Sequence, residues 1–457
     1  MFKRVLCLLL TSVNCLDNQA SELETELLPL PELRDFSLEE LMQIDVVVTS
    51  AAKKAQTLFN TAAAVFVITQ EDIRRSGVTN IPEALRMAPG VQVAHFDANK
   101  WAISIRGFNG RFANKLLVLI DGRSVYTPLF SGVFWNEQDL PLEDLERIEV
   151  IRGPGATLWG VNAVNGIINI ITKSAKDTQG KLITAGAGTE ERGFVTARYG
   201  GMLSDAYYRI YAKYFKRDNA VDLEGASGKD EWDIGRGGFR LDWEFSTADA
   251  VTFQGDIYDG NAGQTLTQAS LAPPFFQIND SDIVLSGGNL LRRWQHILSP
   301  SSQLGLQLYF SREKRATSDF FEQRLDTVDI DFQHEFQLGE KQEIIWGLNY
   351  QYNHIASEGS FAVSLEPNDS DLNRFSAFLQ NEIAILPEQL RLTLGSKLEH
   401  NEFTGFEVQP NARLLWTPHP RHALWAATSR AVRTPSIAER NARSNQQVFL
   451  EPSSLPK

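Results

Sequence analysis

The sequence is poor in cysteine, with two residues, Cys7 and Cys15, among 457. Both lie in residues 1–20, which we expect to be absent from the mature chain. That chain would contain no cysteine, which excludes disulfide bonds and thiolate chemistry.

The N-terminus has the pattern of an export signal. Lys3 and Arg4 supply a positive end, and a short apolar run follows from Val5 to Val13. A signal peptide of this kind predicts cleavage near Ala20. A buried N-terminal helix is the alternative for this segment.

Long apolar runs and an excess of basic residues are also missing. After residue 20 no stretch approaches the roughly 18 apolar residues of a spanning helix, so a membrane-embedded chain would have to cross as β-strands. Acidic residues outnumber basic ones, 57 to 44. Nucleic-acid binding needs a basic face, so no nucleic-acid partner is expected.

Motifs for catalysis, metal binding or phosphate binding are not found. The seven histidines are scattered. His419 and His422 are close in sequence, but two further metal ligands are not apparent. The stretch GPGATLWG lacks the Lys-Ser/Thr that completes a phosphate loop. We therefore expect no enzyme, no metal and no cofactor.

Residues 176–457 show the alternation of a transmembrane β-barrel. In the run Leu390–Glu399, leucines occupy one face and polar residues the other. Similar alternation occurs near 251–257, 303–310 and 344–351. Segments of about ten residues with this pattern are typical of strands between lipid and a watery lumen. A soluble β-sandwich shares the alternation, so the connections must decide.

The connections alternate between short turns and longer polar links, as they do on the two rims of an outer-membrane barrel. This pattern predicts about 13 strands, ending near Ala431. Short turns are expected near Gly200–Asp205, Ser246–Ala250, Ser299–Ser302, Gly339–Lys341, Pro387–Glu388 and Pro418–Arg421. Longer links are expected at Lys216–Asp230, Asp259–Ser281, Arg312–Glu322, Ile355–Asp371 and Asn401–Gln409.

Residues 62–175 have mixed α/β character. Strands are expected in AVFVITQ, VQVAHF, WAISIRGF, KLLVLIDGR and LERIEVIRG, and short helices in EDIRRSG and IPEALRMAPG. The stretch GPGATLWGVNAVNG then leads into the apolar run Ile167–Ile171. Its glycines indicate backbone that passes through a tight space.

Residues 21–61 form an acidic, Leu- and Pro-rich arm. It contains the run Ile44–Ser50 (IDVVVTS), which Lys53 and Lys54 follow. An isolated β-branched run has unpaired backbone groups. It is either an edge strand of the following domain or a peptide that adds to the sheet of a partner.

The segments PEALRMAPGVQV, ISIRGFNGR, KLLVLIDGRSVY and LERIEVIRGPGATLWGVNAVNGIINIITK, in this order, resemble the plug domain of TonB-dependent outer-membrane receptors. The resemblance extends from Ala62 to Lys173. It implies an α+β plug domain followed by a transmembrane antiparallel β-barrel, which in this family has about 22 strands. The chain then divides into a signal peptide (1–20), an arm (21–61), a plug (62–175) and a barrel (176–457).

The resemblance also implies energised import through the outer membrane of a Gram-negative cell. In such receptors a scarce ligand binds between the plug and the outer loops. TonB, driven by an inner-membrane complex, then pairs with an N-terminal peptide and pulls on it through backbone hydrogen bonds. The arm is similar to that of one subgroup, which favours the partner-binding alternative. The TonB box would consist of Asp45, Val46, Val47, Val48, Thr49 and Ser50.

Two plug arginines match family positions. Arg106 in SIRGF and Arg152 in VIRGP resemble buried arginines that pair with inward-facing barrel glutamates, and Glu149 would join that network. An unpaired buried guanidinium is costly, so carboxylate partners are expected. The alternative is that either arginine faces the watery lumen.

Two loops that the family directs outward combine aromatic residues with an arginine. Stacking and a charge-assisted contact would suit a ferric chelate or another bulky planar ligand. Alternatively, the aromatic residues pack the plug against the barrel wall. The candidate ligand-binding residues are Phe108, Asn109, Arg111, Phe112, Tyr126, Phe130, Phe134 and Trp135.

The barrel is shorter than the family pattern. We count about 13 of about 22 strands, and the final SSLPK lacks the aromatic terminal residue typical of such barrels. An open edge would leave unpaired backbone in lipid. We therefore expect the chain to be truncated, interrupted, or half of a split receptor.

Three functions are consistent with the resemblance. The first is import of a ligand, most often a ferric siderophore in this family, with cobalamin, haem, copper or oligosaccharides as alternatives. The second is a signalling transducer, which needs an extra N-terminal domain. The roughly 25 residues before the box are too few for one. The third is a non-transporting remnant or binding protein.

Overall fold

The computed structural model describes residues 47–54, 56–221, 224–419 and 421–445. The expected signal peptide, Asp45 and Val46 lie outside these residues. The described residues belong to one compact unit, Val46–Lys457. Among them, no helix is both long enough and apolar enough to cross a membrane.

The first half of the chain contains a five-stranded sheet with the strand order β3-β8-β9-β6-β7. β6 and β9 run parallel, and the other neighbours are antiparallel. A separate hairpin pairs β4 with β5. The strands are β3 (Val65–Thr69), β4 (Val91–Asp97), β5 (Lys100–Ile105), β6 (Leu116–Ile120), β7 (Arg123–Ser124), β8 (Leu145–Arg152) and β9 (Gly166–Thr172).

The main helix of this half, α3 (Gln70–Ser76), has signals at both ends. The Thr69 hydroxyl accepts a hydrogen bond from the Asp72 backbone N–H, and the Asp72 carboxylate accepts one from the Thr69 N–H. This capping box satisfies two backbone donors. Gly77 ends the helix in the left-handed region, with φ of 73°. The other helical elements of this half are α4 (Ile81–Ala84), α5 (Ala156–Trp159) and the 3-10 turns η2 (Leu58–Asn60), η3 (Leu85–Met87), η4 (Trp135–Glu137), η5 (Leu142–Asp144) and η6 (Lys176–Thr178).

The capping box gives a first prediction. Thr69→Ala removes the hydroxyl acceptor, and we expect it to destabilise the start of α3 by about 1 kcal/mol. Hydrogen exchange of the Asp72 amide should then accelerate roughly fivefold. Arg75→Ala, which removes an exposed ion pair with Glu71 in the same helix, is the control and should leave that rate unchanged. An unchanged Asp72 rate in Thr69→Ala would contradict the assigned cap.

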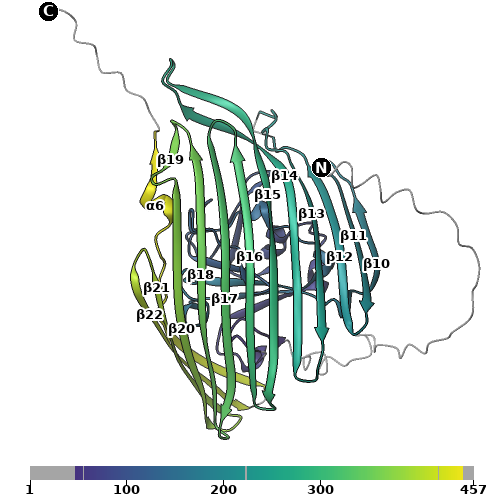
Figure 1. Ribbon diagram of the computed structural model, residues 1–457, viewed down its shortest axis with the longest axis vertical. Coiled ribbons are helices and arrows are strands. Elements are labelled where there is room, and N and C mark those ends of the chain that lie inside the picture. Colours follow the sequence, from purple (N-terminus) through teal and green to yellow (C-terminus); the bar gives the residue numbers. More distant parts are fainter. Residues whose placement is uncertain (1–46, 55, 222–223, 420, 446–457) are drawn as a thin grey trace, which may run out of the picture. The chain divides into compact units, whose positions relative to one another are not determined.

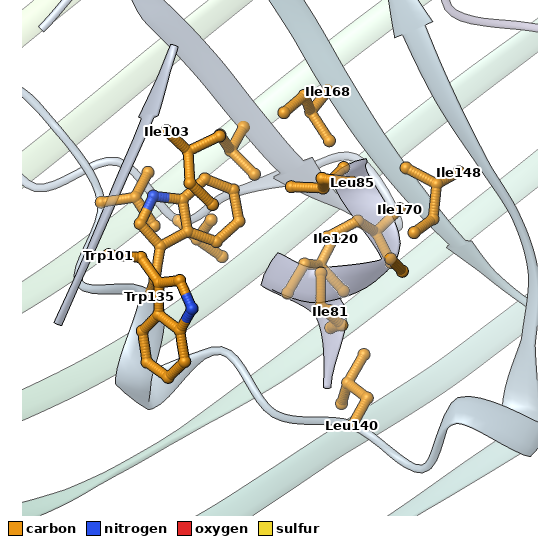
Figure 2. Close-up of a cluster of buried hydrophobic side chains, with 14 of the residues drawn as sticks. Ile81, Leu85, Trp101, Ile103, Ile120, Trp135, Leu140, Ile148, Ile168 and Ile170 are labelled. Carbon is orange, nitrogen blue, oxygen red and sulfur yellow. The ribbon is translucent and has the colours of Figure 1, made fainter. Parts of the chain in front are cut away.

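The buried core of this half is built from both of its layers. Ile148, Ile168 and Ile170 of the sheet form one cluster with Ile81 and Leu85 of the helical layer (Figure 2). The cluster extends beyond this half and includes seven side chains of the second half, among them Phe215, Trp232 and Ile234. The two halves therefore share one core.

Gly166, at the start of β9, confirms the expected tight passage of the backbone. A Cβ atom at this position would collide with the Ile151 carbonyl oxygen and lie 2.7 Å from the Ile105 Cδ1 atom. A larger residue would therefore push β9 away from β8, with which it pairs in this region.

The second half is one antiparallel sheet of thirteen strands arranged in chain order (Figure 1). This is the number expected from the sequence. In the part of the chain that the structure describes, the end strands β10 and β23 each pair on one side only. The strands are β10 (Gly180–Gly186), β11 (Glu191–Leu203), β12 (Ala206–Arg217), β13 (Trp232–Glu244), β14 (Asp249–Ala269), β15 (Phe276–Ser299), β16 (Ser302–Thr317), β17 (Phe321–Leu338), β18 (Gln342–Gly359), β20 (Asp369–Leu386), β21 (Leu390–Asn401), β22 (Gly405–His419) and β23 (His422–Ser429).

Side chains of this sheet alternate between two faces. On β16, Tyr309 is buried (4% exposed), while its neighbour Phe310 is 42% exposed on the outer face. Cross-strand partners share a face. A row of outward side chains therefore runs through Phe253, Arg292 and Leu308. The short turns between these strands lie where the sequence predicts them.

Two of the longer links differ from the prediction, whereas the link at Lys216–Asp230 lies between β12 and β13 as expected. Asp259–Ser281 is mostly paired strand, because β14 continues to Ala269 and β15 begins at Phe276. Arg312–Glu322 likewise reduces to the three residues between β16 and β17. The prediction ended each strand where the sequence becomes polar. Strands pair through their backbone groups, so the pairing continues where the side chains on both faces of the sheet are polar.

The segment after β23 turns back towards the first half. Asn162 donates its backbone N–H to the Val432 carbonyl oxygen, and Ile437 donates to that of Pro128. The segment contains α6 (Ile437–Asn441) and β24 (Ala442–Ser444), and β24 pairs with β19 (Val363–Leu365), which lies between β18 and β20.

Candidate functional site

The described part of the expected TonB box, residues 47–50, is an extended segment. β1 (Val47–Val48) pairs antiparallel with β2 (Gln56–Thr57) in a small sheet of its own. Val47 is 43% exposed, whereas Ser50 is 1% exposed. The segment therefore passes from solvent into the interior within four residues.

Glu149 anchors the inner end of this segment. Its carboxylate accepts hydrogen bonds from the backbone N–H of Thr49 at 3.0 Å, and from the N–H and hydroxyl of Ser50 at 2.8 and 2.5 Å. Arg147 pairs with the same carboxylate at 2.8 Å. Glu149 is fully buried, so these contacts replace the water that the charge has lost. Arg147 and Glu149 are two residues apart on β8, so both side chains lie on the same face of the strand.

The two lysines after residues 47–50 attach the arm to the barrel wall. Lys53 pairs with Asp331 at 3.2 Å, and Lys54 pairs with Glu343. The Lys53 ammonium also lies 5.0 Å from the centroid of the Trp159 ring. Both lysine side chains are less than 10% exposed, at 8% and 9%. Their sequence position offered no signal for these partners, which come from strands almost three hundred residues later.

The ion pairs between plug and barrel have the opposite polarity to the expected one. Carboxylates of the plug meet basic residues of the barrel wall. At least one partner in each pair is almost inaccessible to water, so loss of the other would leave a buried charge unpaired. The pairs are Glu137 with Arg315 (2.8 Å), Asp139 with Lys213 (2.7 Å), Asp144 with Arg198 (2.5 Å) and Asp144 with Arg209 (3.6 Å).

Arg106 and Arg152 form no ion pair within the described residues. Arg106 is exposed and has a φ of 57°. Arg152 donates to the Pro89 carbonyl oxygen at 3.2 Å. Arg106 is thus a surface residue and Arg152 is half-buried, and their pairing with barrel glutamates stays a prediction. Glu149 contacts the arm and Arg147, and no barrel residue in the described part.

Five of the eight candidate ligand residues line one cavity of about 170 Å³. Its aromatic wall is continuous. The Phe130 ring lies 5.0 Å from that of Phe112 and 4.8 Å from that of Phe134, both edge to face. The Arg111 guanidinium lies 5.2 Å from the Phe112 ring centroid. Trp135 completes the set but also belongs to the plug core, at 7% exposed.

A barrel residue missed by the sequence reasoning completes this cavity. The Arg315 guanidinium lies 4.5 Å from the Phe134 ring centroid and pairs with Glu137. Its side chain lies on the inner face of β16, like those of Gln307 and Tyr309. The alternation of polar and apolar residues predicts this inward direction, but it does not predict which plug residue Arg315 contacts.

The other three candidates lie elsewhere. Tyr126 lines a separate cavity of about 60 Å³ with Asn162 and Thr434, and burial raises the pKa of its phenol well above the usual value. Phe108 is 74% exposed, and the Lys115 ammonium lies 4.6 Å from its ring centroid. Asn109 hydrogen-bonds the next residue in its own loop. The structure thus separates these three from the aromatic cavity.

Comparison with protein families divides the chain in the same order. Residues 57–167 match the family described as "TonB-dependent Receptor Plug Domain". Residues 174–454 match "TonB dependent receptor-like, beta-barrel". The two matches together account for most of the described residues.

Individual relatives are similar over long stretches. The iron-regulated outer membrane virulence protein of Vibrio cholerae is 25% identical over 418 residues, covering 86% of this chain and 61% of that protein. The vitamin B12 transporter BtuB of Vibrio vulnificus is 33% identical over 165 residues, covering 35% of this chain and 26% of that protein. A mutant ferric enterobactin receptor of Pseudomonas aeruginosa has a similar fold, with a TM-score of 0.68 at 18% identity, covering 86% of this chain and 64% of that chain. The chain therefore spans less than two thirds of the length of these relatives.

Proposed function

The chain belongs to the family of TonB-dependent receptors, and from this premise we propose that it takes part in the uptake of a ferric siderophore across the outer membrane. The family consists of receptors and transporters that bind small ligands and interact with TonB. For this chain, the ligand, the partner and its export to the outer membrane are parts of the proposal.

The observation that carries the proposed ligand class is the aromatic cavity. Arg111 and Arg315 supply positive charge beside the faces and edges of three phenylalanine rings. Ferric catecholate chelates are anionic and have flat aromatic arms, so cations and rings in one cavity are complementary to them. Two of the similar proteins carry iron-related names, an iron-regulated virulence protein and a ferric enterobactin receptor.

Ligand titration of the purified chain tests this assignment. Ferric enterobactin should quench tryptophan fluorescence, because Trp135 lines the cavity. The dissociation constant from the titration should be roughly 1 μM or below. Cyanocobalamin is the second probe, since one relative is a vitamin B12 transporter. Quenching by cyanocobalamin alone would assign the chain to that second ligand class. Binding of neither would overturn the ligand proposal.

The second part of the proposal is that residues 45–50 are the TonB box. The exposed, extended Val47 and its pairing with a short strand support this, because TonB would replace β2 as the strand partner. Glu149, Lys53 and Lys54 would hold the segment against plug and barrel until TonB engages it.

The box assignment predicts the effect of proline at its exposed end. Val47→Pro removes one backbone N–H from the pairing edge. We expect capture of the periplasmic domain of TonB to fall roughly tenfold, which corresponds to about 1.4 kcal/mol. Val47→Ala keeps the N–H and should capture TonB like the unaltered chain. Equal capture by all three chains would argue against a box at this position. Quenching by ferric enterobactin should be the same in all three chains, because Val47 does not line the aromatic cavity.

A further inference from the structure

A basic residue on β15, Arg292, stands among apolar side chains on the outer face of the large sheet. Arg292 on β15 is outward and exposed, with Phe253 of β14 on one side and Leu308 of β16 on the other. The outward positions of β15 between Val284 and Trp294 carry no other charge. Arg292 forms no ion pair or hydrogen bond within the described residues.

This arginine borders a shallow hollow with a volume of about 480 Å³. Apart from Arg292, every residue that lines it is apolar or aromatic. Asp249 lies further towards the short turns, opposite His296, and contacts the Trp294 indole N–H at 3.1 Å and His296 at 2.7 Å rather than Arg292. The lining residues are Trp243, Phe245, Val251, Phe253, Arg292 and Trp294.

The hollow lies towards the end of the sheet that carries the short turns. Trp243 is the second-last residue of β13, and Phe245 belongs to the turn before β14. Lys54 of the arm pairs with Glu343, the second residue of β18, at the same end of the sheet. If residues 45–50 meet TonB, as proposed above, this end is periplasmic. Indole and phenyl rings at such an end mark the level of the lipid headgroups.

We propose that the hollow binds one glycerophospholipid of the periplasmic leaflet. Its phosphate meets the Arg292 guanidinium beside the rings of Trp243, Phe253 and Trp294, and an acyl chain runs from there away from the short turns, past the exposed Leu290 of β15. A guanidinium binds a phosphate through two parallel hydrogen bonds, which an ammonium cannot reproduce. The phosphate also supplies the counter-charge that no described residue provides.

Native mass spectrometry of the purified chain in dodecyl maltoside tests the site. With phosphatidylglycerol, the unaltered chain should retain one lipid, and R292Q should retain roughly fivefold less. R312Q is the matched control. Arg312 is also outward, on β16, but it is paired with Asp326 at 2.5 Å, so its loss should leave lipid retention unchanged.

Further arms distinguish the sources of the phosphate and guard against misfolding. Diacylglycerol, which lacks the phosphate, should not be retained by the unaltered chain, and inorganic phosphate should not displace the lipid. R292K, which keeps the charge, should retain an intermediate amount.

Equal retention by R292Q and the unaltered chain would overturn the proposal, as would retention of diacylglycerol or displacement by inorganic phosphate. Preference for lipid A would overturn the leaflet assignment. None of these measurements depends on siderophore binding or TonB, so failure here is distinguishable from failure of the proposed uptake.

Discussion

Glu149→Gln is expected to make trypsin cleave after Lys53 and Lys54 roughly a hundredfold faster than in the unaltered chain. The carboxylate of Glu149 accepts from two backbone N–H groups and two hydroxyls of the 47–50 segment. An amide of the same size turns its NH₂ group towards these donors, leaving buried groups unpaired at about 3 kcal/mol. The segment should then detach, and proteolysis reports the detached population.

The matched control lies three residues away on the same strand. Glu146→Gln also removes a carboxylate that pairs with Arg147, but Glu146 is 48% exposed and forms no hydrogen bond or ion pair with the arm in the described part. Its cleavage rate should equal that of the unaltered chain. If Glu149→Gln cleaved no faster than Glu146→Gln, the anchoring role of Glu149 would be refuted. TonB capture by Glu149→Gln should rise in parallel with cleavage.

Arg315→Ala is expected to weaken ferric enterobactin binding by roughly thirtyfold, about 2 kcal/mol. The Arg315 guanidinium stacks on the Phe134 ring and forms an ion pair with Glu137. Its loss removes positive charge from the cavity and leaves a buried carboxylate with one fewer partner. The Tyr258 hydroxyl still donates to Glu137 at 3.0 Å, which limits the structural damage. Fluorescence titration measures the change.

Lys314→Ala is the control for Arg315. Lys314 is adjacent in sequence but outward, 46% exposed, and pairs with Glu322. We expect its affinity to match that of the unaltered chain. Arg315→Lys keeps a charge but not the planar stack, so its affinity should be intermediate. Unchanged affinity in Arg315→Ala would remove this cavity from the ligand site.

The secondary structure of the plug could be predicted because each element carries local signals. Gly77 and the Thr69–Asp72 pair bound α3, and the apolar runs of β6, β8 and β9 are stopped by glycine or polar turns. The thirteen strands of the large sheet were equally readable, since the period of two and the short turns are local properties. The parallel pairing of β6 with β9 had no local signal, because it joins residues distant in the chain.

The ion pairs were harder to foresee than the elements. Alternation places Arg315, Lys213 and Arg198 on the inward face, but it does not say which plug group each one meets. That depends on how the plug is rotated within the sheet, a property of the whole core. Glu149 was expected to join the network of Arg106 and Arg152, whereas its carboxylate accepts from the arm and pairs with Arg147. The plug residues of the aromatic cavity were predicted, but Arg315 of the barrel was not, because the orientation of the plug within the sheet could not be predicted.

The strand order of the large sheet bears on how the chain folds. Every neighbouring pair except β18 and β20 is consecutive in the chain, so the sheet can grow one hairpin at a time from local contacts. The plug is different, because β6 must find β9 across 50 residues, from Leu116 to Gly166. Its buried cluster is also incomplete until Phe215 and Trp232 are in place. The half that is made first should therefore be the half that reaches its final packing last, with β12 and β13 serving as part of its template.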